Sequence, residues 1–415
     1  MEIGVIGAGV IGATAALELA RRGHGVTLID RSDGADSAAR GNAGAFAFAD
    51  VIPIATPGIM RKAPGWLLDP AGPLTLAPGY LPRIAPWLAR FWRASWPDRY
   101  APAVSAQTAL MNVSQAALDR LLAAEALEPL LRREGQLQLY DSAQTFRASL
   151  PGWEECRRNG VRFDLIEGAA ALAEYQPGLA ARFTHGAWTP DWMNVTDPAL
   201  WVETITARAL ARGATRLRAA AQAVRPAGQG AEIVTDRGVQ AFDRVVIAAG
   251  AWSGPLARSL GLCLPLDTER GYNTTLPARG FDLRTHVTFS DHGFVVSRIG
   301  DDIRVGGGVE LAGLTRPPRM ARADALLAKA KAFLPGLEVT GGRQWMGFRP
   351  SMPDSLPVIG RAPGAPAVVL AFGHGHLGLT QSPGSAEIVA DLAEGAAPAI
   401  DITPFRPERF SGARA

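Results

Sequence analysis

The residues near the N-terminus of this chain have the types and spacing needed to bind a dinucleotide. Gly7, Gly9 and Gly12 stand in a GxGxxG pattern. The first glycine allows a tight turn, the second lets a pyrophosphate approach the backbone, and the third lets a helix and a strand pack closely. Asp30, about 20 residues further along, can accept hydrogen bonds from ribose hydroxyls. Together these residues predict a dinucleotide site rather than an ordinary glycine-rich turn.

The elements that must position these residues are a strand, a helix and a second strand. Residues 3–6 are apolar and predict a buried parallel strand. Ile11, Ala15 and Leu19 recur at helical spacing, and Gly23 ends the predicted helix. A second strand over residues 26–29 then carries Asp30 at its end. We expect the N-terminus of the helix, with its free N–H groups and positive dipole end, to face phosphates.

Composition excludes several classes of protein. The chain has 415 residues, of which 47% are hydrophobic and 20% charged, with a net charge of +3. Its arginines are scattered among acids rather than massed, which disfavours nucleic-acid binding. Its two cysteines match no metal-ligand spacing and no disulfide framework, so we expect no metal site and a reducing compartment. Neither a secretory signal nor a run of 18 apolar residues occurs, which predicts a cytoplasmic protein.

The pattern of elements predicts an α/β protein with two domains. A Rossmann-like nucleotide domain is expected from three pieces, 1–50, 194–262 and 340–415. A substrate domain of largely antiparallel sheet (α+β) is expected from the insertions 51–193 and 263–339. Within these pieces we expect helices over 143–160, 198–212, 320–333 and 383–394, and a buried strand over 367–372.

Several separated segments together resemble the D-amino-acid oxidase superfamily of flavoproteins, and specifically its bacterial D-amino-acid dehydrogenase branch. The resemblance covers essentially the whole chain, and its GxRPxxPD…PxIG signature is much more specific than GxGxxG. The segments are the N-terminal fingerprint, Asn42-Ala43-Gly44, residues 248–253, Glu269-Arg270-Gly271-Tyr272, VGGGVEL at 305–311, residues 345–350, Pro353-Asp354, residues 356–360 and GHGHLGLT at 373–380.

The resemblance implies that the cofactor is FAD, bound non-covalently because no Cys or His stands where the family would link it. The chain carries one fingerprint, whereas a flavoenzyme reduced by NAD(P)H would usually show a second. Carried over residue by residue, the resemblance implies FAD contacts at Gly7, Ala8, Gly9, Val10, Ile11, Gly12, Asp30, Arg31, Asn42, Ala43, Gly44, Val224, Ala249, Gly250, Trp252, Gly347, Gly375, His376, Leu377, Gly378, Leu379 and Thr380.

Three residues are candidates for the substrate side of the site. By resemblance, Arg349 forms a bidentate pair with a substrate carboxylate, a geometry that Lys cannot reproduce. The alternative is a structural arginine paired with Asp354 or Glu310. Tyr272 either gives the carboxylate a second contact or is a core tyrosine, and His376 either faces substrate and flavin or is a packed loop histidine. Asn273 points to the strand face opposite Tyr272, so we expect one of the two to reach the site.

The implied reaction is oxidation of a D-amino acid, or of a cyclic secondary amine such as a proline derivative. Hydride leaves the substrate α-carbon for flavin N5, and water hydrolyses the imine product. We expect a dehydrogenase, with a quinone as one possible acceptor. The alternatives are an oxidase that reduces O₂ and an FAD-carrying subunit of a larger amine dehydrogenase. The substrate side chain, its chirality, the physiological acceptor and the oligomeric state are not readable from these residues.

Residues 59–100 interleave tryptophans with arginines and prolines. One interpretation is a patch that associates weakly with a membrane surface, which would place the protein at the inner face of the membrane. The other, which we favour, is a packing arm over the substrate domain, because the prolines interrupt any long amphipathic helix.

Overall fold

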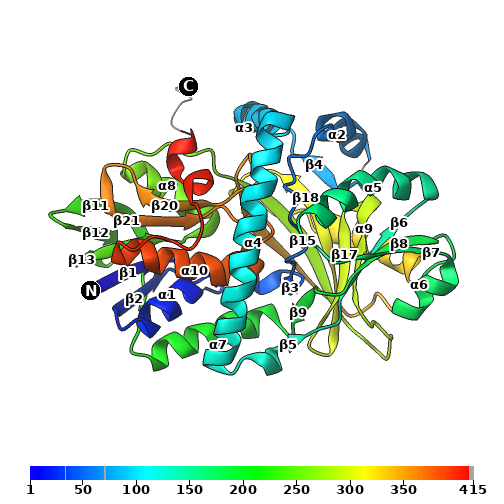
Figure 1. Cartoon of the computed structure of the whole chain (residues 1–415), viewed down its shortest axis with the longest axis horizontal. Coiled ribbons are helices and arrows are strands. Elements are labelled where there is room, and N and C mark those ends of the chain that lie inside the picture. Colours follow the sequence, from blue (N-terminus) through cyan, green and yellow to red (C-terminus); the bar gives the residue numbers. More distant parts are fainter. Residues whose placement is uncertain (33, 70–71, 411–415) are drawn as a thin grey trace.

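The computed structural model describes residues 1–32, 34–69 and 72–410. Two large sheets dominate it, one on each side of the long helix α4 (Pro97–Glu125), as Figure 1 shows. No helix within the described ranges is long and apolar enough to cross a membrane.

The first sheet holds the dinucleotide fingerprint. Its strands pair in parallel except for the last, which runs antiparallel to its neighbour. The order across the sheet is β10 (Thr215–Arg218), β2 (Gly25–Asp30), β1 (Glu2–Ile6), β14 (Arg244–Ile247), β21 (Ala365–Phe372) and β20 (Val358–Ala362).

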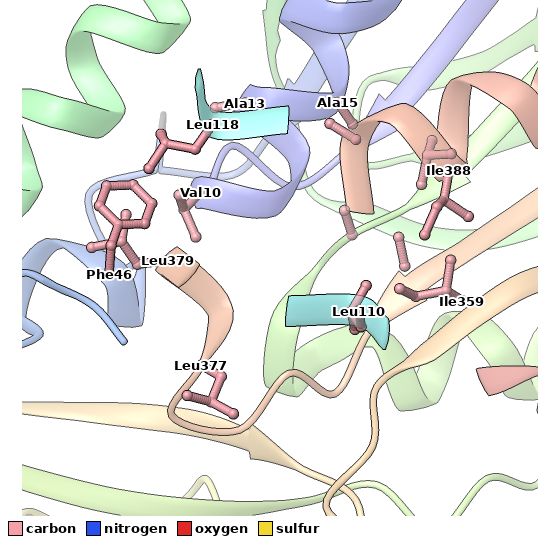
Figure 2. Packing of buried hydrophobic residues seen from close by; sticks show 14 of the residues in the cluster. Val10, Ala13, Ala15, Phe46, Leu110, Leu118, Ile359, Leu377, Leu379 and Ile388 are labelled. Carbon is pink, nitrogen blue, oxygen red and sulfur yellow. The ribbon is translucent and has the colours of Figure 1, made fainter. Parts of the chain in front are cut away.

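Helices cover one face of this sheet and a small sheet covers the other. Helix α1 (Val10–Arg21) packs against α10 (Gly378–Glu394) and α7 (Pro198–Ala211), and α4 packs across α10. Figure 2 shows Leu110 and Leu118 of α4 among Val10, Leu379 and Ile388. The small antiparallel sheet consists of β11 (Ala221–Ala227), β12 (Gly230–Thr235) and β13 (Gly238–Phe242), with α8 (Ser253–Ser259) beside it.

The second sheet is mostly antiparallel and has its own core. Its order is β19 (Arg343–Ser351), β15 (Asp267–Pro277), β18 (Asp302–Leu311), β17 (Phe294–Ile299), β16 (His286–Phe289), β6 (Gln136–Tyr140), β8 (His185–Thr189) and β7 (Asp164–Glu167), with β4 (Leu74–Leu76) beside β18. Phe183, Phe289 and Phe333 pack in its core, the last from helix α9 (Ala321–Phe333).

The remaining elements are short or peripheral. A three-stranded sheet joins β3 (Ala45–Phe46), β9 (Met193–Val195) and β5 (Leu131–Arg132). The other α-helices are α2 (Ile59–Leu68), α3 (Leu81–Ala94), α5 (Ala143–Arg158) and α6 (Ala169–Tyr175). Short 3-10 helices span Ala38–Gly41, Glu128–Leu130, Gly250–Trp252, Ser290–His292, Thr403–Phe405 and Pro407–Phe410.

The α/β fold with a largely antiparallel second sheet is confirmed, and two details differ from expectation. Helix α10 begins at Gly378 rather than Pro383, which lies inside it. Pro383 has no N–H for the Leu379 carbonyl, and the Ser382 hydroxyl donates to that oxygen at 2.9 Å instead. The division into domains stays a prediction, but β19 pairs with β15 in the second sheet although the sequence assigned 340–415 to the nucleotide domain.

Candidate active site

A cavity of about 940 Å³ extends from the fingerprint of the first sheet to strands β15, β18 and β19 of the second. This volume lies at the upper end of the range for ligand sites in proteins. The lining combines the ends of β1 and β2, the N-termini of α1 and α10, and one face of the β15–β19 pair. The cavity can therefore hold a long ligand that touches both sheets.

The fingerprint glycines serve the roles that the sequence predicts for them. Gly7 has a φ of +105°, which favours glycine, and a Cβ there would overlap the Ala248 carbonyl oxygen. A Cβ on Gly12 would overlap the Gly7 carbonyl oxygen, so the helix and the turn touch through bare backbone. Gly9, the N-cap of α1, has no side-chain cap, and it lines the cavity together with Val10 and Ile11. Unsatisfied N–H groups at such a helix start attract anions.

Asp30 holds the loop that follows β2. Its Oδ1 accepts hydrogen bonds from the backbone N–H groups of Ser32 (2.8 Å) and Gly34 (3.0 Å), and its Oδ2 accepts from that of Ala8 (2.8 Å). Burial would raise the pKa of the Asp30 carboxyl, but these hydrogen bonds outweigh it and lower the pKa. A carboxylate has about four acceptor positions, so Oδ2 keeps one for a ligand hydroxyl.

Arg31 and Trp252 form one wall of the cavity. The Arg31 guanidinium carbon lies 4.1 Å from the centroid of the Trp252 ring, a cation–π contact between the segment after β2 and the segment after β14. Both residues line the cavity. Further along, Asn42 Oδ1 accepts the Gly44 N–H at 2.7 Å, which fixes the turn that brings Ala43 to the lining.

Most of the residues predicted to contact the cofactor line this cavity. Those that do are Gly7, Gly9, Val10, Ile11, Asp30, Arg31, Asn42, Ala43, Ala249, Gly250, Trp252, Gly347, Gly375, His376, Leu377, Gly378, Leu379 and Thr380. The four that are not among the lining residues are Ala8, Gly12, Gly44 and Val224.

Of these four, Val224 has the surroundings that differ most from the prediction. Its side chain is fully buried in the core of the first sheet, and the Ser259 hydroxyl bonds both its N–H (2.9 Å) and its carbonyl oxygen (3.1 Å). Its backbone is therefore already satisfied within the protein. Ala219, Ala220 and Ala221, just before it, line the cavity instead.

Strands β15 and β19 present three directly opposed residue pairs, and all six residues line the cavity. Glu269 lies opposite Arg349, Gly271 opposite Gly347, and Asn273 opposite Trp345. The glycines make room for their neighbours, because a Cβ on Gly271 would overlap the Arg349 guanidinium and one on Gly347 would overlap the Trp345 ring. The two strands thus carry one acidic and one basic side chain side by side at the end of the cavity.

Arg349 is held by the backbone and not by a carboxylate. Its Nη1 donates to the Gly308 carbonyl oxygen at 2.9 Å, and it has no ion pair within 4.0 Å among residues 1–32, 34–69 and 72–410. Asp354, one of its two alternative partners, pairs with Arg409 at 2.7 Å. Glu310, the other, lies 3.7 Å from Arg270. Burial lowers the pKa of Arg349, an effect that Glu269 partly offsets.

Tyr272 also lines the cavity, but its hydroxyl is bonded within the protein. Its hydroxyl donates to Glu310 Oε2 at 2.5 Å and accepts the Arg319 N–H at 3.1 Å, and the residue is 1% exposed. The hydroxyl is therefore committed to a buried network that secures the segment after β18. We do not assign it to the substrate. Of the two neighbours, Asn273 belongs to the β15 face that carries Glu269 and Gly271.

His376 lies in the cavity beside Asp50. Its Nε2 is 3.9 Å from Asp50 Oδ2. Desolvation in the cavity, with a smaller contribution from Arg349, lowers the pKa of His376 to about 4 and desolvation raises that of Asp50 to about 7, although the two side chains keep 40% and 41% of their surface exposed. At neutral pH the imidazole is neutral, so this contact is not an ion pair. Asp50 and Glu269 are the two acids at this end of the cavity that the sequence interpretation missed.

A signal for Glu269 was present in the sequence. Glu269 stands two residues before Gly271 and four before Asn273. Because side chains alternate between the two faces of a strand, all three lie on one face. Which face meets the cavity was not readable from that alternation. Asp50 follows the Asn42-Ala43-Gly44 segment with no periodic signal.

Comparison with known proteins agrees with this geometry. The model of the family described as FAD dependent oxidoreductase (DAO) matches residues 2–392. A D-amino-acid oxidase of Bradyrhizobium diazoefficiens is 38% identical, and the match covers 99% of each chain. A D-amino acid dehydrogenase of Rhizobium rhizogenes is 32% identical over 99% of this chain and 100% of the relative.

Solved structures share the fold at lower identity. A glycine oxidase from Geobacillus kaustophilus superposes with a TM-score of 0.74 at 22% identity, covering 98% of each chain. An L-proline dehydrogenase from P. horikoshii superposes with a TM-score of 0.72 at 20% identity, covering 99% of this chain and 98% of that one.

The geometry of the cavity also suits FAD, independently of these comparisons. The N-termini of α1 and α10 line the cavity, and neither has a side-chain cap. Glycines stand at both helix starts, so backbone N–H groups are accessible there. A carboxylate with a spare acceptor, Asp30, stands where the first of them meets β2. These features suit the phosphates and ribose of an extended dinucleotide. The chain therefore belongs to the D-amino-acid oxidase (DAO) family of FAD-dependent oxidoreductases.

Proposed function

We propose that the protein oxidises a D-amino acid or a cyclic secondary amine such as a proline derivative. The observation that carries this proposal is Arg349, a cation that faces a large cavity and has no carboxylate partner among the described residues. A guanidinium in that position can bind a substrate carboxylate through two parallel hydrogen bonds. The names of the relatives, a D-amino-acid oxidase and a D-amino acid dehydrogenase, support the same substrate class.

The residues at the other end of the cavity would hold the cofactor. The N–H groups at the start of α1 would bind the pyrophosphate, and Asp30 would accept from a ribose hydroxyl. The segment from Gly375 to Thr380 at the start of α10 would meet the flavin, where its N–H groups can stabilise negative charge. When bound, FAD supplies the acceptor for the two electrons and the α-hydrogen that the substrate loses.

Arg349 would orient the substrate and also restrict it. The guanidinium is fixed by the Gly308 carbonyl and lies over Gly271, so a bound carboxylate is held in one direction. Fixing the substrate in a reactive orientation is worth a large part of the barrier for such reactions. Water can then hydrolyse the imine product of an amino acid to a 2-oxo acid and ammonia, whereas a secondary amine gives a cyclised product.

We propose that the enzyme is a dehydrogenase, which passes its electrons to an acceptor other than O₂. The relative named as an oxidase, at 38% identity, makes direct O₂ reduction the second candidate. The test is a panel of D- and L-amino acids with N-methyl and cyclic amines, in which dye reduction and O₂ uptake are recorded in parallel. We expect dye reduction by D-amino acids or cyclic amines well above O₂ uptake. Equal rates in the two assays would favour the oxidase, and no turnover of any amino acid would refute the proposal.

A further inference from the structure

Glu269 is the acidic residue best placed to meet the amino group of a substrate whose carboxylate binds Arg349. The two residues face each other across β15 and β19, and opposed residues of antiparallel strands lie about 4.5–5.5 Å apart at their Cα atoms. Both line the cavity. An amino acid carries its carboxylate and ammonium on one carbon, so one molecule can reach both side chains. Glu269 is 8% exposed, and burying a charge there requires a partner.

Oxidation of an amino acid requires a base that removes a proton from the substrate ammonium group. An ammonium nitrogen has no lone pair, whereas removal of the α-hydrogen with its electrons requires that lone pair to form the C=N bond. At neutral pH the amino acid enters as a zwitterion, so its nitrogen must first lose a proton. A base within reach of the nitrogen makes the abundant form of the substrate reactive.

We propose that Glu269 is a catalytic residue that binds the substrate ammonium group and takes one proton from it. In this step an N–H bond breaks and an O–H bond forms on Glu269. The nitrogen keeps the electron pair, and the total charge of the pair is unchanged. This inference rests on the proposed function, because it assumes an amino-acid substrate on Arg349.

A second, smaller cavity also touches Glu269. It measures about 20 Å³, enough for one water molecule, and Glu269 lines both it and the main cavity. Two of its lining residues, Gln107 and His374, each have a buried side-chain atom without a hydrogen-bond partner, Oε1 and Nδ1, and the Ser351 hydroxyl interacts with the Glu269 carboxylate. A water molecule typically needs two to four such partners. We infer that one water binds here and accepts a hydrogen bond from protonated Glu269, which holds the proton while the amine is oxidised.

The charged and titratable groups around Glu269 favour it over its neighbours as the base. From its own strand comes Asp267, from β19 comes Arg349, and from the loops come Asp50, His374 and His376. Burial keeps both imidazoles neutral at pH 7 by lowering the pKa of His374 to about 3 and that of His376 to about 4.

Asp267 bonds the Tyr80 hydroxyl at 3.0 Å, and Asp50 lies beside His376 rather than opposite Arg349. Burial raises the pKa of both Glu269 and Asp50, so basicity does not separate them, whereas the position opposite Arg349 favours Glu269. Asp50 is therefore the competing acid that the experiment has to separate from Glu269.

The test compares Glu269→Gln with Asp50→Asn in FAD-loaded enzyme. For Glu269→Gln we expect kcat/KM for the best amino acid to fall about 10²-fold or more at pH 7. The deficit should then shrink about tenfold per pH unit as the pH rises, because the substrate loses its proton in solution. Asp50→Asn should keep the pH dependence of the wild type. A constant deficit for Glu269→Gln at all pH values, or the pH-dependent deficit in Asp50→Asn instead, would overturn the assignment.

A binding measurement that needs no turnover completes the test. The probes are 2-aminoisobutyrate, which has no α-hydrogen, and isobutyrate, which differs from it by lacking the amino group. Calorimetric titration of the wild type should show tighter binding of the amino compound, and Glu269→Gln should lose at least tenfold of that preference. Retention of the preference in Glu269→Gln refutes the role of Glu269. If the wild type oxidises no amino acid, the proposed function itself fails, which is a different result.

Discussion

Glu269 and Arg349 stand directly opposite each other on β15 and β19 and both face the cavity, yet no ion pair within 4.0 Å joins them. Two opposite charges that are adjacent but unjoined leave hydrogen-bonding positions free for a third molecule. A zwitterion satisfies both, since its carboxylate faces the guanidinium and its ammonium faces the carboxylate. Under the proposed function, the pair would hold the acidic and basic ends of the substrate on two neighbouring strands.

Replacing Arg349 should affect substrate capture and leave the cofactor in place. Arg349→Ala removes the partner of a desolvated carboxylate, a loss of about 3–5 kcal/mol, or roughly 10²–10⁴-fold in kcat/KM. Arg349→Lys keeps the charge without the planar fork and should recover part of this. The measurement is kcat/KM at equal flavin content.

Arg343→Ala is the matched control for Arg349, because Arg343 is an exposed residue of the same strand. We expect its kcat/KM to stay within about twofold of the wild type, as for most surface substitutions. A change below about fivefold in Arg349→Ala would mean that Arg349 is structural.

Removing the Tyr272 hydroxyl should reduce stability rather than activity. Tyr272→Phe leaves the buried Glu310 without its 2.5 Å hydrogen bond, which should cost about 1–3 kcal/mol in the free energy of unfolding. Denaturant unfolding measures this. Tyr175→Phe serves as a control, since the Tyr175 hydroxyl makes no hydrogen bond within the described part of the chain. A raised KM with unchanged stability would return Tyr272 to the substrate site.

Asp30→Ala should lose flavin and also stability. A hydrogen bond to a charged group contributes about 1.5–3 kcal/mol, so FAD affinity should fall about 10- to 100-fold. Because the folded-state pKa of Asp30 is lowered, its stabilisation of the folded chain is present above the unfolded pKa of about 3.9 and is lost as pH falls through the folded value. The measurements are the flavin content and the acid unfolding of the wild type and of Asp30→Ala.

Two outcomes separate the roles of Asp30. Full, tightly held flavin in Asp30→Ala would remove Asp30 from the cofactor site even if the variant unfolds earlier in acid. Asp36→Ala is the control for stability. Asp36 is an exposed acid of the same loop whose carboxylate pairs with Arg31 at 3.5 Å, and its loss should lower the free energy of unfolding by less than about 1 kcal/mol.

Helix α2 is the part of residues 59–100 through which the protein would bind a membrane surface. None of its residues is buried, Leu67 and Leu68 are 45% and 83% exposed, and the same helix carries Arg61 and Lys62. The membrane interpretation predicts weak co-flotation with anionic vesicles that disappears at high salt, because the electrostatic part is screened, whereas the favoured packing arm predicts none. Changing both leucines to Ser should weaken it, whereas the control Val239→Ser, at a 55% exposed residue of β13, should not. No flotation at low salt would favour the packing arm, in which Trp87 is already buried.

The sequence by itself determined the parts of this protein that depend on local chemistry. The fingerprint glycines, the strand–helix–strand unit and Asp30 follow from spacing alone, because a tight turn and a close helix contact leave no room for side chains. Arg349 was identified from its motif, and the structure rules out the ion pairs with Asp354 and Glu310 that were the alternative. The FAD-dependent family was likewise indicated by motifs and is confirmed.

Only the tertiary structure decided which side of each element meets the site. Alternation divides β15 into two sets, one with Glu269 and Asn273 and one with Tyr272, but it does not say which set faces the cavity. That depends on β19, which joins the second sheet from a distant part of the sequence. The start of α10 depended in the same way on a hydroxyl that replaces a missing backbone hydrogen bond, a contact that helix-start signals do not encode.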